Sequence, residues 1–229
     1  MRAGDRVLDV ANGAGNTAIS TARRYGETTG IDYVLDLIEQ AKRRADVEGL
    51  EITFEVGDAE DLPYGDASFD VVLSTFGVMC APDQEKTAGE LLRVCKPAGK
   101  IDLVNWTSDG FIGQLLKTVG KYVPQPSGLK PRPLWGTEER LHELFGGEVS
   151  TVEAARRIFT WRYPSAKAFV ENFRDYYGPT LKAFEALGSE DQDEALARDF
   201  AELIGGWNTS GDQTVVVPSY YLEAVATRR

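Results

Sequence analysis

Short apolar runs alternate with helix-like segments over roughly the first 106 residues, and this alternation most constrains the fold. The runs that predict strands cover residues 6–11, 28–32, 51–56, 69–76 and 100–106. Between them, apolar residues recur at intervals of three and four, the periodicity of an amphipathic helix. Strands alternating with helices form right-handed crossovers and a parallel sheet covered on both faces. We therefore predict an α/β fold.

The second half of the chain has a different pattern. Four prolines in residues 124–133 predict an exposed connection. Residues 137–145 read as a helix that begins at an N-cap threonine, and 149–163 as a long strand. Residues 164–212 contain two helical stretches with apolar stripes. A final strand, 213–228, is long and interrupted by polar residues, so we place it near a sheet edge.

The acidic composition narrows the possible partners. The chain has 229 residues and a formal net charge of −11, and residues 1–110 hold 11 basic and 20 acidic side chains, a net charge of −9. This composition lacks the cationic surface that nucleic acids and anionic membranes require. One histidine and two cysteines offer no metal-ligand spacing. No apolar run is long enough to span a membrane, and no signal peptide is apparent. We expect a cytoplasmic protein with reduced thiols and no metal.

The first predicted strand ends in a turn whose residues indicate a ligand-binding site. In DVANGAGN, Gly13 and Gly15 open a helix, which lets backbone amides approach a ligand and directs a positive helix end at it. A two-glycine turn serves NAD, FAD, phosphate or tight packing alike. Asp32 ends the second strand and Asp58 follows the third, where carboxylates can accept from ribose hydroxyls and from a base amine. The three loops outline a nucleoside-shaped site.

Asp9 distinguishes between possible cofactors. It places a carboxylate on the first strand, two residues before the turn. Such a carboxylate repels a pyrophosphate and favours a cation, such as an ammonium group near a sulfonium centre. The alternative is that Asp9 caps its own turn.

Four motifs together resemble the class I S-adenosylmethionine-dependent methyltransferases. They are VLDVANGAGNTA, TGID, GDAEDLPYGDASFDVVLST and LLRVCKPAGKIDLVNW, which occur in order over roughly residues 6–110. The resemblance implies one Rossmann-like domain over 1–229, a three-layer sandwich with a seven-stranded, mostly parallel sheet in the order 3-2-1-4-5-7-6, the last strand antiparallel. Residues 1–110 would bind the cofactor, 111–163 and 213–229 would complete the sheet, and 164–212 would be a helical insertion, a possible cap over the acceptor.

The resemblance also implies which residues bind the cofactor. The glycine turn would hold its methionine part, Asp32 its ribose and Tyr33 its adenine ring, while Asp58 and Ala59 would bind the adenine amine and ring. The segment after the fourth strand would face the methionine and the methyl group. The implied set is Asp9, Ala11, Asn12, Gly13, Gly15, Asn16, Asp32, Tyr33, Asp58, Ala59, Ser74, Thr75 and Phe76.

The implied reaction is an in-line attack on the sulfonium methyl, with S-adenosylhomocysteine as product. No catalytic side chain follows from the sequence: His142 is typical of a surface residue, and Cys80 has no apparent base beside it. We assign Met79, Trp106 and Trp135 to a small-molecule acceptor. Helical aromatics, among them Phe169, either line that pocket or pack the core.

Two other functions stay open. GAGNTA also matches a dinucleotide fingerprint, which would make the chain an NAD(P)-dependent oxidoreductase. The chain is alternatively a non-catalytic cofactor-binding subunit with a partner. We expect a monomer or a homodimer. The first strand begins near Arg6, so either an N-terminal lid is missing or 164–212 covers the cofactor.

Overall fold

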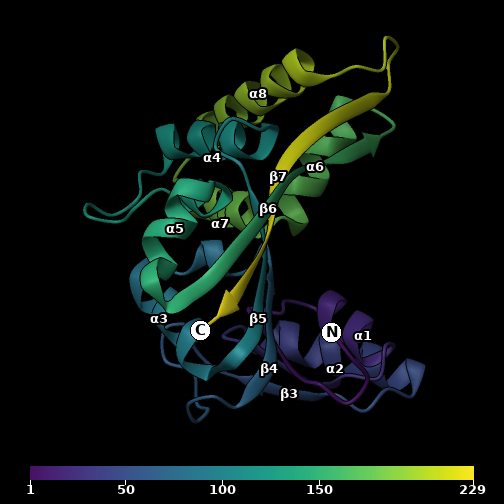
Figure 1. Ribbon diagram of the computed structural model, residues 1–229. Helices are drawn as coiled ribbons and strands as arrows, with labels where there is room; N and C mark the ends of the chain where they lie inside the picture. Colours follow the sequence, from purple (N-terminus) through teal and green to yellow (C-terminus); the bar gives the residue numbers. More distant parts are fainter. The chain divides into compact units, whose positions relative to one another are not determined.

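The computed structural model describes residues 1–229, which form seven strands and eight α-helices joined by short 3-10 turns (Figure 1). The strands are β1 (Arg6–Val10), β2 (Glu27–Asp32), β3 (Thr53–Val56), β4 (Phe69–Thr75), β5 (Cys95–Trp106), β6 (Val149–Tyr163) and β7 (Val215–Arg228). The helices are α1 (Asn16–Ala22), α2 (Leu35–Glu48), α3 (Gln84–Val94), α4 (Phe111–Tyr122), α5 (Glu138–Phe145), α6 (Ala166–Tyr176), α7 (Gly178–Ala186) and α8 (Glu190–Trp207). None of these helices has the length and apolar character needed to cross a bilayer.

The sheet has the order β3-β2-β1-β4-β5-β7-β6, which confirms the expected order. Strands β1 to β5 pair in parallel. Two bonds show that β7 runs the other way along β5: Lys100 Nζ donates to Thr227 Oγ1, and Thr107 N donates to the Tyr220 carbonyl. Residue numbers increase along β5 in the direction in which they decrease along β7, so the two strands are antiparallel. β7 lies one strand in from the edge strand β6.

Helices cover both faces of the parallel strands in the part that holds β1 to β4 (Figure 1). α1 and α2 bury Ala18, Ile38 and Ala41 against Phe54 of β3, on the face to which Asp9 also points. α3 contacts β4 from the opposite face, and α5 packs on α3. Burial on both faces explains why β1 and β4 are mostly apolar runs in the sequence.

The chain divides into two compact units. Unit 1 comprises residues 1–105, 130–155 and 222–229, and unit 2 comprises 106–129 and 156–221. The predicted insertion 164–212 falls in unit 2, where α4 packs on α8. The core of this unit is aromatic: the Phe111 ring lies 5.6 Å from that of Phe169 and 6.3 Å from that of Phe200. Phe169 therefore packs the core, which is one of the two roles predicted for the helical aromatics.

β5 begins five residues earlier than the predicted strand, at Cys95 instead of Lys100. Cys95 pairs with Phe69, after which the register shifts before Val71 pairs with Lys100. Ala98 takes up this irregularity with a φ of 62°, a left-handed conformation. A bulge accommodates Pro97 and Gly99 within the strand.

Candidate functional site

Asp9 lies in the sheet at the base of the glycine turn. Its side chain is buried, and Oδ2 accepts a bond of 2.9 Å from the backbone N–H of Ala18 in α1. Burial raises the pKa of Asp9 to about 7; the Ala18 bond opposes this rise and the charge of Asp32 adds to it. The carboxylate thus holds the start of α1, and it is a buried negative charge beside the turn when ionised.

Asp32 links the ends of β1 and β2. Its Oδ2 accepts from Gly13 N at 2.8 Å, and its Oδ1 accepts from Val34 N at 2.9 Å. The side chain is 5% exposed. Each carboxylate oxygen has a second lone pair, so the group holds the turn and can still accept from a ligand hydroxyl.

The glycine turn is tightly packed against its neighbours. Gly15 has a φ of 83°, and a Cβ there would lie 2.9 Å from Ala41 Cβ on α2. Ala11 also has a left-handed backbone, with a φ of 52°. Across the turn, a Cβ on Gly77 would lie 2.4 Å from the Ala11 carbonyl oxygen. Gly77 therefore lets the segment after β4 approach the turn closely.

Two further contacts hold the turn. Arg44 Nη1 of α2 donates to the Ala14 carbonyl at 2.5 Å, and Thr17 Oγ1 donates to Thr75 Oγ1 at 2.9 Å. The sequence analysis missed Gly77 and Arg44. The only hint of Gly77 in the sequence is that a glycine directly follows the STF segment, residues 74–76. Arg44 looks like any charged residue on an amphipathic helix, so nothing in the sequence marks it.

Asn12 and Asn16 flank the glycines. Asn12 is buried; its Nδ2 donates to the Gly13 carbonyl, while its Oδ1 has no hydrogen-bond partner. A Cβ on Gly30 of β2 would lie 2.8 Å from this Oδ1, so the amide points towards β2. Asn16 begins α1 and is exposed.

The proposed adenine residues are at the surface. Tyr33 is 74% exposed directly after β2. Asp58 is exposed and Ala59 half-buried in the loop that follows β3. Asp58 Oδ1 accepts from Glu60 N at 2.9 Å, a local turn that orients the carboxylate. An exposed aromatic ring and an exposed carboxylate therefore follow adjacent parallel strands, at the same edge of the sheet.

The three residues around the end of β4 differ in their surroundings. Ser74 is buried; its hydroxyl donates to the Val10 carbonyl and accepts from Val78 N, so it connects β1 to the 3-10 turn η1 (Val78–Cys80). Thr75 is exposed, and Phe76 is half-buried with a φ of 61°. Ser74 is thus committed to the backbone, whereas Thr75 is available at the surface.

The three predicted acceptor residues lie in two units. Met79 and Trp135 belong to unit 1, where η1 contacts the 3-10 turn η2 (Arg132–Gly136) that carries Trp135. Both are buried, and Trp135 Nε1 has no hydrogen-bond partner. Trp106 is in unit 2, where its ring lies 6.0 Å from that of Trp161. His142 is exposed on α5, outside these clusters.

Comparison with known sequences places this chain among methyltransferases. The family described as "Methyltransferase domain" matches residues 7–99. The uncharacterized protein Rv1403c of Mycobacterium tuberculosis is 40% identical over 205 residues, which cover 89% of this chain and 74% of that protein. The ubiquinone/menaquinone biosynthesis C-methyltransferase UbiE of Bdellovibrio bacteriovorus is 40% identical over 102 residues, 44% of this chain and 43% of that enzyme.

Solved structures share the fold. The YcgJ protein of Bacillus subtilis superimposes with a TM-score of 0.69 at 20% identity, covering 100% of this chain and 93% of that one. A phosphoethanolamine N-methyltransferase of Haemonchus contortus, solved with S-adenosylhomocysteine, has a TM-score of 0.62 at 20% identity, covering 100% of this chain and 50% of that one.

Proposed function

This chain belongs to the class I methyltransferase family, and on that premise we propose that it transfers a methyl group from S-adenosylmethionine to a small-molecule acceptor. One observation carries the proposal. The glycine turn is bonded to Asp32, the predicted ribose acceptor, while the buried Asp9 lies at its base. This arrangement suits a cationic nucleoside better than a pyrophosphate, because two carboxylates adjoin the turn.

The residues present fit this cofactor. Gly15 lets the turn pack closely on Ala41 of α2, whereas an added Cβ at Gly13 would meet nothing within 4 Å, which leaves room beside the turn for the methionine part. Asp32 has lone pairs left for the ribose hydroxyls. Tyr33 and Asp58 provide an exposed ring and a carboxylate for the adenine. When bound, the cofactor supplies the electrophilic methyl group.

The protein's share in the reaction is binding and alignment. Asp9, when ionised, would favour the cofactor's positive charge from the base of the turn, and the segment 74–76 would place the cofactor against the acceptor. No side chain of this chain is assigned as a base. Around the acceptor we propose the apolar side chains of Met79 and Trp135 in unit 1, which suit an uncharged, partly apolar molecule.

Two further points support a small acceptor. UbiE is named as a C-methyltransferase of ubiquinone and menaquinone biosynthesis, and these acceptors are small molecules. The net charge of −11 disfavours nucleic acid and anionic membranes as partners. We also propose a cytoplasmic location, because both cysteines are free thiols in the structure.

Calorimetric titration with S-adenosylhomocysteine and, separately, with NADH tests the proposal. We expect saturable binding of S-adenosylhomocysteine and none of NADH. Saturable binding of NADH alone would contradict it. Binding of S-adenosylhomocysteine without methyl transfer in a broad acceptor screen would instead favour a non-catalytic subunit.

A further inference from the structure

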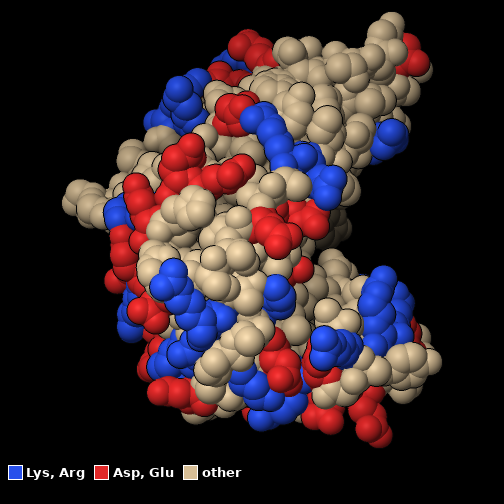
Figure 2. Space-filling view, in the orientation of Figure 1, with Lys and Arg blue, Asp and Glu red and all other residues tan.

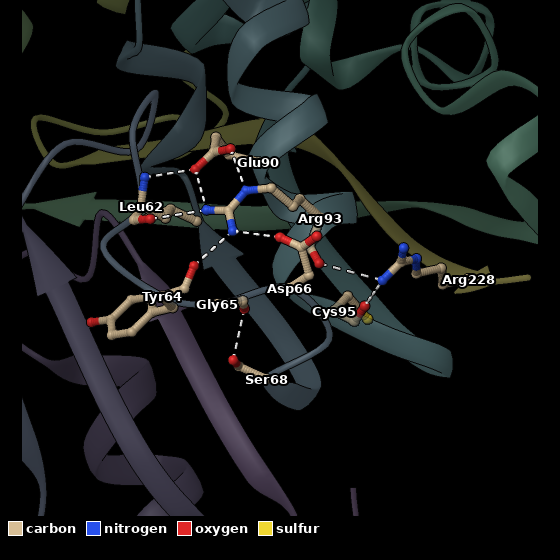
Figure 3. Close-up of polar contacts among 9 residues, drawn as sticks. All are labelled: Leu62, Tyr64, Gly65, Asp66, Ser68, Glu90, Arg93, Cys95 and Arg228. Atoms are coloured by element: carbon tan, nitrogen blue, oxygen red, sulfur yellow. Dashed lines mark hydrogen bonds and ion pairs between the residues drawn. The ribbon is translucent and has the colours of Figure 1, made fainter.

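The loop between β3 and β4, residues 57–68, carries the proposed adenine residues at its start and is held by α3 further along (Figure 3). Leu62 N donates to Glu90 Oε2 at 2.7 Å. In return, Arg93 Nη2 donates to the Leu62 carbonyl at 2.9 Å, and Arg93 Nη1 to the Tyr64 carbonyl at 2.6 Å. Backbone groups of this loop therefore bond to side chains of one helix.

Arg93 is fully engaged in this contact. Its Nε and Nη2 pair with the two oxygens of Glu90, both at 2.7 Å, and Nη1 also donates to Asp66 Oδ1 at 3.0 Å. With the two carbonyls, this satisfies all five N–H groups of the guanidinium. The side chains of Arg93 and Glu90 are 30% and 16% exposed, so the pair is partly shielded from water. A bidentate pair in this setting is geometrically specific.

The same loop is also tied to the beginning of α3. Asp83, the N-cap residue of the helix, donates its backbone N–H to Glu60 Oε1 at 2.7 Å. Glu60 in turn donates its own N–H to Asp58. The segment 58–64 is thus attached at Glu60 to the first turn of α3 and at Leu62 and Tyr64 to its last turn. Asp58 and Ala59 lie just before these attachments.

We infer that Arg93 is a positioning residue for base recognition: by fixing residues 62–64 on α3, it acts with the Glu60–Asp83 bond to hold Asp58 where it accepts from the 6-amino group of the adenine. This inference rests on the proposed function. Arg93 bonds the loop and not the ligand, so its removal leaves Asp58 present but free to move. Loss of a fixed position weakens the bond that depends on it, and leaves the Tyr33 and Asp32 contacts with the ring and the ribose in place.

The test compares two ligands on three proteins. S-adenosylhomocysteine carries the 6-amino group, and S-inosylhomocysteine has an oxygen there that cannot donate to Asp58. Calorimetry gives both dissociation constants for the wild type, for Arg93→Met and for Arg23→Met. Arg23 is the matched control, because it makes a similar bidentate pair with Glu48 between α1 and α2.

We expect the wild type to prefer the amino ligand by about 10- to 150-fold, which corresponds to one hydrogen bond to a charged group. Arg93→Met should lose most of that preference by weakening the amino ligand alone, while Arg23→Met keeps it. An undiminished preference in Arg93→Met, equal weakening of both ligands, or no preference in the wild type would overturn the inference. Failure of the wild type to bind either ligand would instead overturn the proposed function.

A second variant covers the case in which Arg93→Met does not fold. Glu90→Gln keeps the size of the side chain and removes the charge that pairs with Arg93. It should lower the preference for the amino ligand in the same direction. A full preference in Glu90→Gln would count against Arg93 as the element that positions the loop.

Discussion

Asp9 is a buried carboxylate whose ionisation is costly, and this gives the folded chain a pH-dependent stability. Its pKa of about 7 in the folded chain is well above the ordinary value of 3.8. Between these values the folded state binds a proton more tightly than the unfolded state does. The contribution of Asp9 to the free energy of unfolding is therefore present at low pH and lost as pH rises to about 7.

Urea unfolding of the wild type and of Asp9→Asn at several pH values measures this contribution. Asparagine keeps the size and the acceptor for Ala18 N but does not titrate. We expect the wild type to lose stability relative to Asp9→Asn by up to about 1.4 kcal/mol per pH unit between roughly pH 4 and 7. Parallel stability curves for the two proteins would contradict a raised pKa of Asp9.

Asp32 combines a structural and a ligand-binding role. Replacing it with alanine removes the acceptor for Gly13 N and the proposed acceptors for the ribose. We expect Asp32→Ala to weaken S-adenosylhomocysteine binding by about 1.5–3 kcal/mol for each charged hydrogen bond lost. Asp36→Ala is the control, because Asp36 is an exposed acid in the first turn of α2. Calorimetry compares the two, and equal affinities would argue against Asp32 as the ribose residue.

At the scale of elements, the site depends on how closely the segment after β4 approaches the turn after β1. A Cβ on Gly77 would lie 2.4 Å from the Ala11 carbonyl oxygen and 2.6 Å from its Cβ. Because the obstacle is mainly backbone, the segments must separate to accommodate a methyl group. Gly77→Ala should cost about 1–3 kcal/mol of unfolding free energy and weaken cofactor binding.

The matched comparison is Gly120→Ala in α4, where nothing lies within 4 Å of the added Cβ. That change should stabilise the chain by about 0.5–1 kcal/mol, because alanine favours a helix over glycine. Thermal unfolding of both variants measures the difference. If Gly77→Ala proved as stable as Gly120→Ala, the close approach would not be a constraint.

The sequence allowed the elements to be predicted wherever burial imposes a pattern. β6 was located at 149–163 because its run of β-branched and aromatic residues is bounded by turn signals. β5 was placed too late, because a bulge containing Ala98 reads as a turn. The order of the strands came from the family resemblance, since local periodicity carries no information on pairing across long distances.

The residues of the candidate site also fall into those with a local sequence signal and those without one. Asp9 and Asp32 were identifiable because they lie at the C-terminal ends of predicted strands, in β1 and β2. Arg93 was not, because its carbonyl partners Leu62 and Tyr64 lie 31 and 29 positions away in the chain. Before folding, it looks like a solvent-facing arginine of an amphipathic helix. Residues that act through long-range contacts have no local signal.

At the scale of the whole molecule, the acidic balance agrees with the proposed ligand. Figure 2 shows Lys and Arg side chains interspersed with Asp and Glu on the visible face. The net charge of −9 in residues 1–110 therefore reflects a general excess, to which Asp9, Asp32 and Asp58 contribute at the proposed cofactor site. Such an excess favours a cationic ligand over a phosphate-rich one.

A crystal structure of the protein with S-adenosylhomocysteine bound tests the central claim most directly. The account predicts the ribose hydroxyls within hydrogen-bond distance of Asp32, the adenine amine at Asp58, and the methionine part along the turn that contains Gly13 and Gly15. A ligand bound away from these three loops, or the ribose or the adenine amine held by other residues, would contradict it.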